Sequence, residues 1–337
     1  MYNTIPKVSI IVPVFNAGKY LQKCLETLQA QTMKELEIIL ILDCPTDGSD
    51  VLAKNIAAHD SRFIIVENST NKHIGLSRNI GIAKATGEYI GFSDHDDYRE
   101  LDMYEQLYKK AKETDADIVV SIPQTTLKKD DGNIEEFPVF EGNSERKNYC
   151  LDNLLSLGGL SNNNSPFATI HGNLYRRSLL LDNHLQFIDT KIITPEDYIF
   201  NVSVFHKASN IQFINKKFYF HITHTHNTGN ESFYRDYKFR GPGLEFLYRQ
   251  TQTWGDLDKY QQALYRGLSK QAIHILATAF CGKNYKHFII VRNYFRKTSC
   301  FQEALKHYDL PNNKVWYKQL FRHFLLWNLT EPLRKSS

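Results

Sequence analysis

Apolar runs of strand length alternate with helical stripes along the first 125 residues. Five runs predict strands: VSIIVPVF (8–15), LEIILILD (36–43), RFIIVE (62–67), EYIGFS (88–93) and DIVVSI (117–122). Between them, apolar positions three and four residues apart predict helices, most clearly at Leu21, Cys24, Leu25 and Leu28. Because these strands are apolar on both faces and alternate with helices, the pattern predicts an α/β fold, a mainly parallel sheet flanked by helices.

Polar side chains follow three of these strands at the point where each strand ends. Asn16 comes after the first strand, next to Phe15, and Asp43 ends the second. The fourth strand is followed by the segment Asp94, His95, Asp96 and Asp97. Ligands of parallel sheets bind beyond the carboxyl ends of the strands. The sequence therefore predicts a ligand site that these segments share.

Three explanations compete for the acidic segment after the fourth strand. A solvated turn that caps the next helix suits Asp97, because a helical pattern begins near Leu101. A calcium loop of the EF-hand type is excluded, since Arg99 occupies the position that needs glycine. The third is a divalent cation bound by one or two carboxylates together with phosphates of a substrate, as Mn²⁺ and Mg²⁺ prefer. Crowded carboxylates at a ligand-binding edge favour this third explanation.

Two further segments carry candidate chemistry. Glu196 and Asp197 precede the apolar YIF and predict a helix start, where acids serve either as caps or, near a ligand, as a general base. In FYFHITHTHNT (218–228), His224 and His226 share one face of an extended segment. They are candidates for contact with phosphate or metal, with a polar strand edge as the equal alternative.

Four segments in this order resemble family 2 of the inverting nucleotide-sugar glycosyltransferases, which have the GT-A fold. They are VSIIVPVFNAGKYLQKCLETLQAQT, ILDCPTDGSD, GLSRNIGIAKATGEYIGFSDHDD, and HGNLYRRSLL followed by TPEDYIFNVSVFHKA. The third segment ends in the family's DxD motif, and the fourth resembles its acceptor-side half. Two positions depart from the usual pattern: His73 stands where asparagine is usual, and Cys44 replaces the second of two aspartates.

The resemblance implies roles for individual residues. The nucleotide sugar would be contacted by Pro13, Phe15, Asn16, Asp43, Arg78, Asp94, His95 and Asp96. Asp43 would accept a hydrogen bond from uracil, Asp96 would be the main ligand of Mn²⁺ or Mg²⁺, and Asp94 would contact the metal or the ribose. Asp197, the second acid of its pair, would be the general base, and attack opposite the diphosphate would invert the anomeric centre.

Charge and cysteine usage bear on compartment and partners. Five scattered cysteines without a CxxC pair suit a reducing cytoplasm, and no signal peptide or apolar stretch of about 18 residues is evident. Residues 283–337 carry 11 Lys and Arg against 3 Asp and Glu, whereas the overall net charge is +4. This basic, aromatic-rich tail predicts either peripheral contact with the inner face of the cytoplasmic membrane or a core-facing helix with a solvated side. No nucleic-acid module is recognisable.

These observations lead to one leading hypothesis. Residues 1–125 would form the nucleotide-sugar half of a GT-A domain, 126–230 its acceptor half, and 231–337 a helical C-terminal extension. The chain would move a hexose or N-acetylhexosamine from a UDP-sugar to a glycan or glycolipid acceptor of the bacterial surface. A nucleotidyltransferase is a weaker alternative, because FNAGKYLQK has a single glycine after the first strand. A glycan-binding protein with a relic donor site would be credible only without Asp96 or Asp197.

Overall fold

A computed structural model describes residues 6–125, 136–157, 167–191, 196–222, 238, 240–281, 285–307 and 329. The chain divides into two compact units. The first comprises Met1–Cys150, Asn163–Ile192 and Glu196–Asn227, and the second comprises Leu151–Asn162, Ile193–Pro195 and Thr228–Ser337. The predicted boundaries at 125/126 and 230/231 stay a prediction. The predicted donor and acceptor halves share one sheet, and a division into compact units does not separate parts of one sheet.

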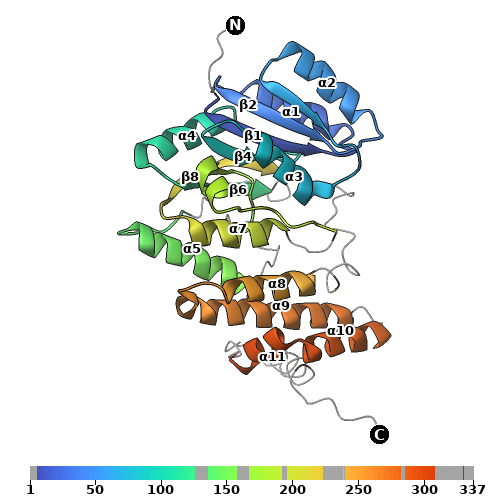
Figure 1. Cartoon of the computed structure of the whole chain (residues 1–337), viewed down its shortest axis with the longest axis vertical. Coiled ribbons are helices and arrows are strands. Elements are labelled where there is room, and N and C mark those ends of the chain that lie inside the picture. Colours follow the sequence, from blue (N-terminus) through green and yellow to red (C-terminus); the bar gives the residue numbers. More distant parts are fainter. Residues whose placement is uncertain are drawn as a thin grey trace. The chain divides into compact units, whose positions relative to one another are not determined.

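The first unit is built on an eight-stranded sheet in the order β3-β2-β1-β4-β7-β6-β8-β5. Figure 1 labels its strands β1, β2, β4, β6 and β8. Its strands are β1 Val8–Val14, β2 Leu36–Leu42, β3 Phe63–Glu67, β4 Tyr89–Phe92, β5 Tyr98–Arg99, β6 Ile118–Thr125, β7 Asn173–Arg176 and β8 Ile211–His221. Its helices are α1 Tyr20–Gln29, α2 Ser49–His59, α3 His73–Lys84, α4 Met103–Thr114, α6 Arg177–Asp182 and α7 Glu196–Lys207; α5 Asn143–Leu157 begins in this unit and ends in the second.

The α/β architecture predicted from the apolar pattern is confirmed. β1 pairs in parallel with β2 and β4, β2 pairs in parallel with β3, and all seven residues of β1 and of β2 are buried. The antiparallel strand β7 lies between β4 and β6. No local pattern indicates this insertion, because β4 and β7 are separated by about eighty residues.

Alternate residues of β1 meet different helices, which is why this strand is apolar throughout. Val8, Ile10, Val12 and Val14 belong to a core that also contains buried residues of α1 and α4. Ile11 faces the other way and lies against Gly81 of α3. On β4, Gly91 approaches the ring of Tyr104 on α4. The next residue, Phe92, contacts the ring of Phe187, which precedes α7, and the ring of Phe200 on α7. Helices therefore cover both faces of the sheet.

The second unit is helical over its described residues, as predicted for the C-terminal region. It contains α8 Gly241–Thr251, the 3-10 turn Leu257–Lys259, α9 Gln261–Cys281, α10 Tyr285–Lys297 and α11 Ser299–Lys306. Edge-to-face packing of Phe295 and Phe301 joins α10 to α11, and Tyr265 of α9 stacks on His307. Its buried residues are mostly Leu, Ile and Ala, and these aromatic contacts join the helices to one another.

The start of α3 approaches the backbone of the 187–188 segment closely. A Cβ atom on Gly75 would overlap the carbonyl oxygen of Ile188. Asn79, one turn further along α3, donates a hydrogen bond to the carbonyl oxygen of Phe187 and accepts one from its backbone N–H, both at 2.8 Å. Glycine at position 75 permits this contact because it has no side chain.

Gly75→Ala is expected to lower the free energy of unfolding by about 1–3 kcal/mol, because the methyl group would force α3 away from Ile188. Urea denaturation measures this. Gly142→Ala is the matched control, since a Cβ there meets nothing within 4 Å, and it should change stability by no more than about 0.5 kcal/mol. Equal stabilities of the two variants would contradict the close approach.

Candidate active site

The ends of β1 and β2 are joined through Asn16. Its backbone has a φ of 46°, and its side-chain oxygen accepts hydrogen bonds from the backbone N–H of Thr46 at 2.7 Å and from the Thr46 hydroxyl at 3.3 Å. The neighbouring Phe15 is 44% exposed, which is unusual for a large apolar side chain at the end of a buried strand. Phe15 and Asn16 thus form a partly open surface beside the sheet edge.

Asp43 ties the ends of β2 and β3 to the segment that precedes α3. Its Oδ1 atom accepts hydrogen bonds from the side chain of Asn68 and from the backbone N–H of Lys72, each at 2.7 Å. Among the described residues, no donor reaches Oδ2. The carboxylate is buried, and one of its two oxygens remains available as an acceptor.

His73, the residue that departs from the family pattern, begins α3 in the left-handed region with a φ of 62°. Asparagine adopts this conformation more readily than most other residues do. Here the preceding Asn71 supports the turn, because its side-chain oxygen accepts a hydrogen bond from the backbone N–H of His73 at 3.0 Å. The turn therefore forms with histidine at this position.

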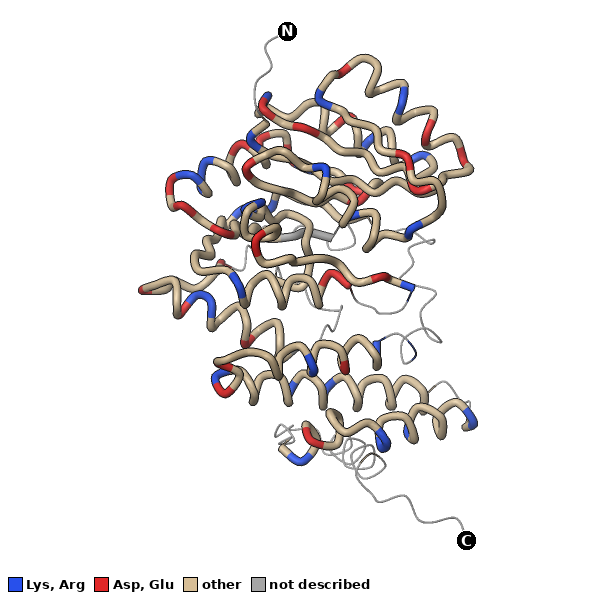
Figure 2. The backbone as a smooth tube through the Cα atoms, viewed as in Figure 1, with Lys and Arg blue, Asp and Glu red and all other residues tan. Residues whose placement is uncertain are grey.

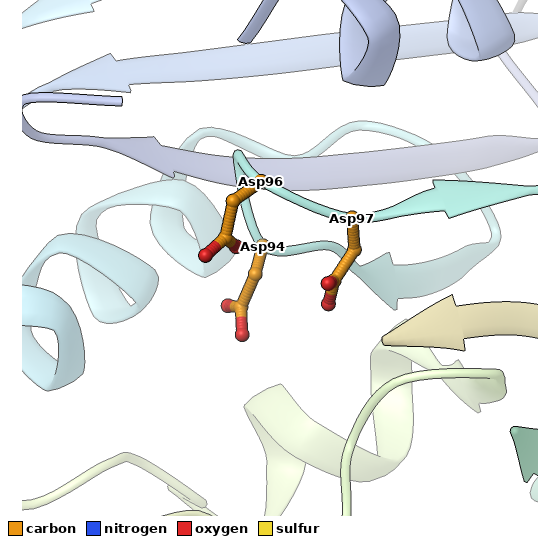
Figure 3. Close-up of side chains that lie close together, drawn as sticks. All are labelled: Asp94, Asp96 and Asp97. Carbon is orange, nitrogen blue, oxygen red and sulfur yellow. The ribbon is translucent and has the colours of Figure 1, made fainter. Parts of the chain in front are cut away.

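Asp94, Asp96 and Asp97 lie together in the turn after β4. Each offers a carboxylate oxygen, and these atoms lie within 4.8 Å of one another. Figure 3 shows the three side chains projecting to the same side of the turn. The intervening His95 is directed to β1, where its Nδ1–H donates to the carbonyl oxygen of Pro13 at 3.0 Å. The sequence pattern therefore does bring three acids together, with the histidine held apart from them.

Asp97 does not cap the following helix, and that interpretation of the turn is wrong. α4 begins at Met103, and Asp102 stands at its N-cap position. Asp97 is buried and instead accepts hydrogen bonds from the Tyr219 hydroxyl at 2.7 Å, the Ile222 backbone N–H at 2.8 Å and His221 Nδ1 at 3.2 Å. Both of its oxygens serve to join the turn to β8, a contact between residues more than 120 positions apart.

Arg78 of α3 reaches three acids from two other parts of the chain. Its Nη2 atom lies 3.0 Å from Asp94 Oδ1, and its Nη1 atom lies 3.1 Å from Glu196 Oε1 and 2.5 Å from Asp197 Oδ1. The side chain is 2% exposed, and its guanidinium lies over the ring of Phe187. Burial alone would lower the pKa of Arg78, but the three carboxylates raise it.

Sequence reasoning missed His171, which lies in the quoted HGNLYRRSLL segment. Its Nε2 atom is 3.1 Å from Asp94 Oδ1, and its ring stacks on Tyr219. Burial opposes the charged form, but Asp94 raises the pKa of His171. In turn, burial would raise the pKa of Asp94, and His171 and Arg78 hold it well below its usual value. The only local signal for a role of His171 is its place directly before Gly172 and the strand β7.

The described site holds more negative than positive groups. Its carboxylates are Asp94, Asp96, Asp97, Glu196 and Asp197, and the cationic side chains beside them are Arg78, His171 and His221. Burial raises the pKa of Glu196 to about 7, and Asp197 adds to the effect while Arg78 opposes it. Arg99, whose Nη2 donates to the Asp97 carbonyl oxygen at 3.0 Å, is a further buried cation beside the turn. A site this rich in carboxylate oxygens fits a hard divalent cation.

Glu196 and Asp197 begin α7, as the sequence predicted. The side chain of Glu196 is 15% exposed and that of Asp197 21%, so both are partly accessible from outside. His224 and His226 lie outside the described residues. No helix among the described residues is long and apolar enough to cross a membrane.

Comparison with known proteins identifies relatives of this chain. The family model described as glycosyl transferase family 2 matches residues 9–182, just over half of the chain. The uncharacterized glycosyltransferase EpsJ of Bacillus subtilis is 30% identical over 226 residues, which cover 64% of this chain and 60% of that protein. Cholesterol galactosyltransferase of Borreliella burgdorferi is 33% identical over 218 residues, 63% of this chain and 59% of that protein. The match thus spans about three fifths of these relatives.

Solved structures show the same fold. Residues 1–349 of Staphylococcus aureus TarS, in complex with UDP-GlcNAc, align with a TM-score of 0.68 and 18% identity over 96% of this chain and 89% of that one. Mannosyltransferase PcManGT of Pyrobaculum calidifontis, in complex with GDP-Man and Mn²⁺, aligns with a TM-score of 0.53 and 15% identity over 97% of this chain and 86% of that one.

His221 should make stability depend on pH. The hydrogen bond to Asp97 raises the pKa of His221 to about 9, above the ordinary value of 6.5. The histidine therefore stabilises the fold fully below about pH 6.5, and this contribution is lost as the pH rises through 9. Its side chain is 42% exposed, so solvent screening limits the size of the effect.

The difference in melting temperature between the wild type and His221→Gln tests this expectation. It should be largest near pH 6 and should shrink to near zero above about pH 9.5. A difference that is the same at both pH values would show that the contact with Asp97 does not depend on the histidine charge.

Proposed function

The chain belongs to glycosyl transferase family 2. On that premise we propose that it is an inverting, metal-dependent glycosyltransferase that moves a hexose or N-acetylhexosamine from a UDP-sugar to a hydroxyl of a bacterial surface glycan or glycolipid. The observation that carries the proposal is the acidic turn after β4, which lies beside the carboxyl ends of parallel strands and is joined through Arg78 to the acids of α7.

The donor half of the proposal assigns the nucleoside to the ends of β1 and β2. Pro13, Phe15 and Asn16 would line the pocket, and Phe15 is exposed enough to contact a base. Asp43 would accept a hydrogen bond from uracil through Oδ2, since Oδ1 already has two donors. TarS structures contain UDP and UDP-GlcNAc. That donor class is the one we propose for this chain.

Asp96 and Asp94 would hold Mn²⁺ or Mg²⁺. Asp97 is the less suitable ligand, because Tyr219, His221 and Ile222 already use both of its oxygens. When bound, a divalent cation supplies Lewis-acid stabilisation of the charge that develops on the diphosphate. His95 would shape the pocket through its hydrogen bond to the Pro13 carbonyl, which sets the distance between β1 and the turn.

Asp197 would act as the general base. The acceptor hydroxyl loses its proton as its oxygen attacks the anomeric carbon, and a carboxylate within hydrogen-bond reach is suited to take that proton. Asp197 is partly exposed at the first turn of α7. Attack from the side opposite the departing nucleotide inverts the configuration at the anomeric carbon. Glu196 would accept the second hydrogen bond from Nη1 of Arg78.

Peripheral membrane contact would suit a glycolipid acceptor. Of residues 283–337, the structure describes 285–307 and 329. Helix α10 carries basic and no acidic residues (Figure 2). Tyr285, Lys286, Ile290 and Lys297 are exposed on it and, at roughly 100° per residue, lie within one arc of its surface. Exposed aromatic, aliphatic and basic groups on one side are typical of helices that bind anionic membranes.

The central prediction concerns nucleotide release in the presence of Mn²⁺ across a panel of UDP-sugars. We expect release from one sugar type, loss of release with EDTA, and a fall of about 10²-fold or more for Asp96→Ala, because stabilisation of the leaving diphosphate is lost. Proton NMR of the product should show the inverted anomer.

Asp102→Ala is the matched control for Asp96→Ala. It also removes a carboxylate from the segment that follows β4, but Asp102 pairs with Lys216. Its activity should stay within about twofold of the wild type, since surface ion pairs contribute little. Release that resists EDTA and survives Asp96→Ala would contradict the metal-dependent mechanism.

Flotation with phosphatidylglycerol-containing vesicles tests the membrane contact on the full chain. Lys286→Glu with Lys297→Glu should weaken binding about tenfold or more, because each basic residue near an anionic surface contributes about 1 kcal/mol. The same charge change at Lys23 and Lys109, both exposed in the first unit, should leave binding largely unchanged. Equal flotation of both double variants would rule out contact through α10.

A further inference from the structure

One buried cation connects the two sides of the proposed reaction. Arg78 contacts Asp94 on the donor side and Glu196 and Asp197 on the acceptor side. We propose that Arg78 is a positioning residue, which holds one oxygen of Asp197 so that the other is directed to the acceptor hydroxyl. This inference rests on the proposed function and deepens it, since it assigns Arg78 to the base rather than to the nucleotide.

The hydrogen bonds of the guanidinium favour this assignment. Nη1 carries two hydrogens and contacts two carboxylate oxygens, Glu196 Oε1 and Asp197 Oδ1, while Nη2 contacts Asp94. The side chain is 2% exposed. Among the described residues, every acceptor of Nη1 and Nη2 is thus a carboxylate, while the buried Nε has no partner. The planar fork of arginine, with donors in fixed directions, is suited to contact several carboxylates at once.

The surroundings of Arg78 fix its direction. Its guanidinium lies 5.2 Å from the centre of the Phe187 ring. Phe187 is in turn held by its two backbone hydrogen bonds with Asn79, the residue next to Arg78 on α3. The same short stretch of helix thus supplies both the cation and the clamp on the ring beneath it. A side chain that positions a reactive group, as we propose for Arg78 and Asp197, must itself be held in a fixed orientation by its surroundings.

Holding the carboxylate this way has a chemical consequence. A carboxylate with one oxygen held by a fixed donor presents its other oxygen in a defined direction, as an oriented reaction requires. Oδ1 of Asp197 is held by Arg78, and the proposal assigns the acceptor hydroxyl to Oδ2. Because Asp94 shares the same cation, the donor-side turn and the base are held by one group. A buried ion cluster is weak support for stability by itself, so a geometric role explains it better.

A double-mutant cycle on the full chain tests the inference. Arg78→Lys keeps the charge but replaces the fork by one ammonium group, which cannot hold three carboxylates in the same geometry. We expect its kcat for transfer to fall about 10²-fold, as a misplaced reactive group produces, with the KM for the UDP-sugar within about threefold. Asp197→Asn alone should also lower kcat strongly. Adding Arg78→Lys to Asp197→Asn should then cost less than about threefold more, because residues that act as one unit are not additive.

Two further variants guard against a loss of folding. Arg62→Lys is the matched control, because Arg62 also makes a forked ion pair, with Asp60, outside the site; it should leave kcat and KM unchanged. Asn79→Ser leaves every charge in place but loosens Phe187 beneath the guanidinium. It should lower kcat about tenfold, again with little further effect in the Asp197→Asn background, and thermal melts confirm that each variant is folded.

The outcomes separate the inference from the function. Two results in an active wild type would overturn the inference and assign Arg78 to the nucleotide. In one, Arg78→Lys raises the KM for the UDP-sugar and leaves kcat unchanged. In the other, Arg78→Lys lowers kcat by the same factor in the Asp197→Asn background as in the wild type. Unchanged kinetics for both Arg78→Lys and Asn79→Ser overturn it as well. A wild type that releases no nucleotide from any donor overturns the proposed function, and the inference with it.

Discussion

Neutralisation of clustered carboxylates is the constraint on which this site depends. Parallel strands bring their carboxyl ends to one edge, and here that edge carries Asp43 and the acids of the turn after β4. Partly buried negative charges raise one another's free energy unless cations or hydrogen-bond donors compensate them. Each acid is accordingly supported from a different element: Asp94 by Arg78 and His171, Asp97 by β8, and Asp43 by the segment before α3.

The supporting groups also define which acids remain available for chemistry. Asp97 is buried and uses both oxygens for contacts within the chain. Asp43 uses one oxygen in the same way. Asp94 is paired with two cations, and Asp94 and Asp96 are both half-buried, unlike Asp97. Acids that are chemically alike in the sequence therefore differ in the structure, because their partners differ. The same distinction applies to α7, where burial raises the pKa of Glu196 to about 7.

Aromatic packing and the charge network support each other on the α3 side of the sheet. Phe92, Phe187 and Phe200 form a cluster of rings beneath the site, with Phe187 and Phe200 stacked at 3.9 Å between centroids. Arg78 lies over the same Phe187 ring, so the apolar core extends directly to the buried guanidinium. Close approach at Gly75 and the backbone bonds of Asn79 hold α3 against this segment. The position of the cation is thus set by the packing of the fold.

The sequence by itself determined the alternation of strands and helices in the first 125 residues, the parallel central sheet, the acidic turn and the start of α7. These features depend on local periodicity and on residue types within a few positions, so they can be recognised without knowing what lies opposite. Only the tertiary structure decided that β7 inserts antiparallel beside β4, that Asp97 joins β8 rather than capping α4, and that His171 and Arg78 meet at Asp94. Arg78 and Asp197 are 119 positions apart. No local pattern encodes such a pair, because the contact is produced by the folding of the whole unit.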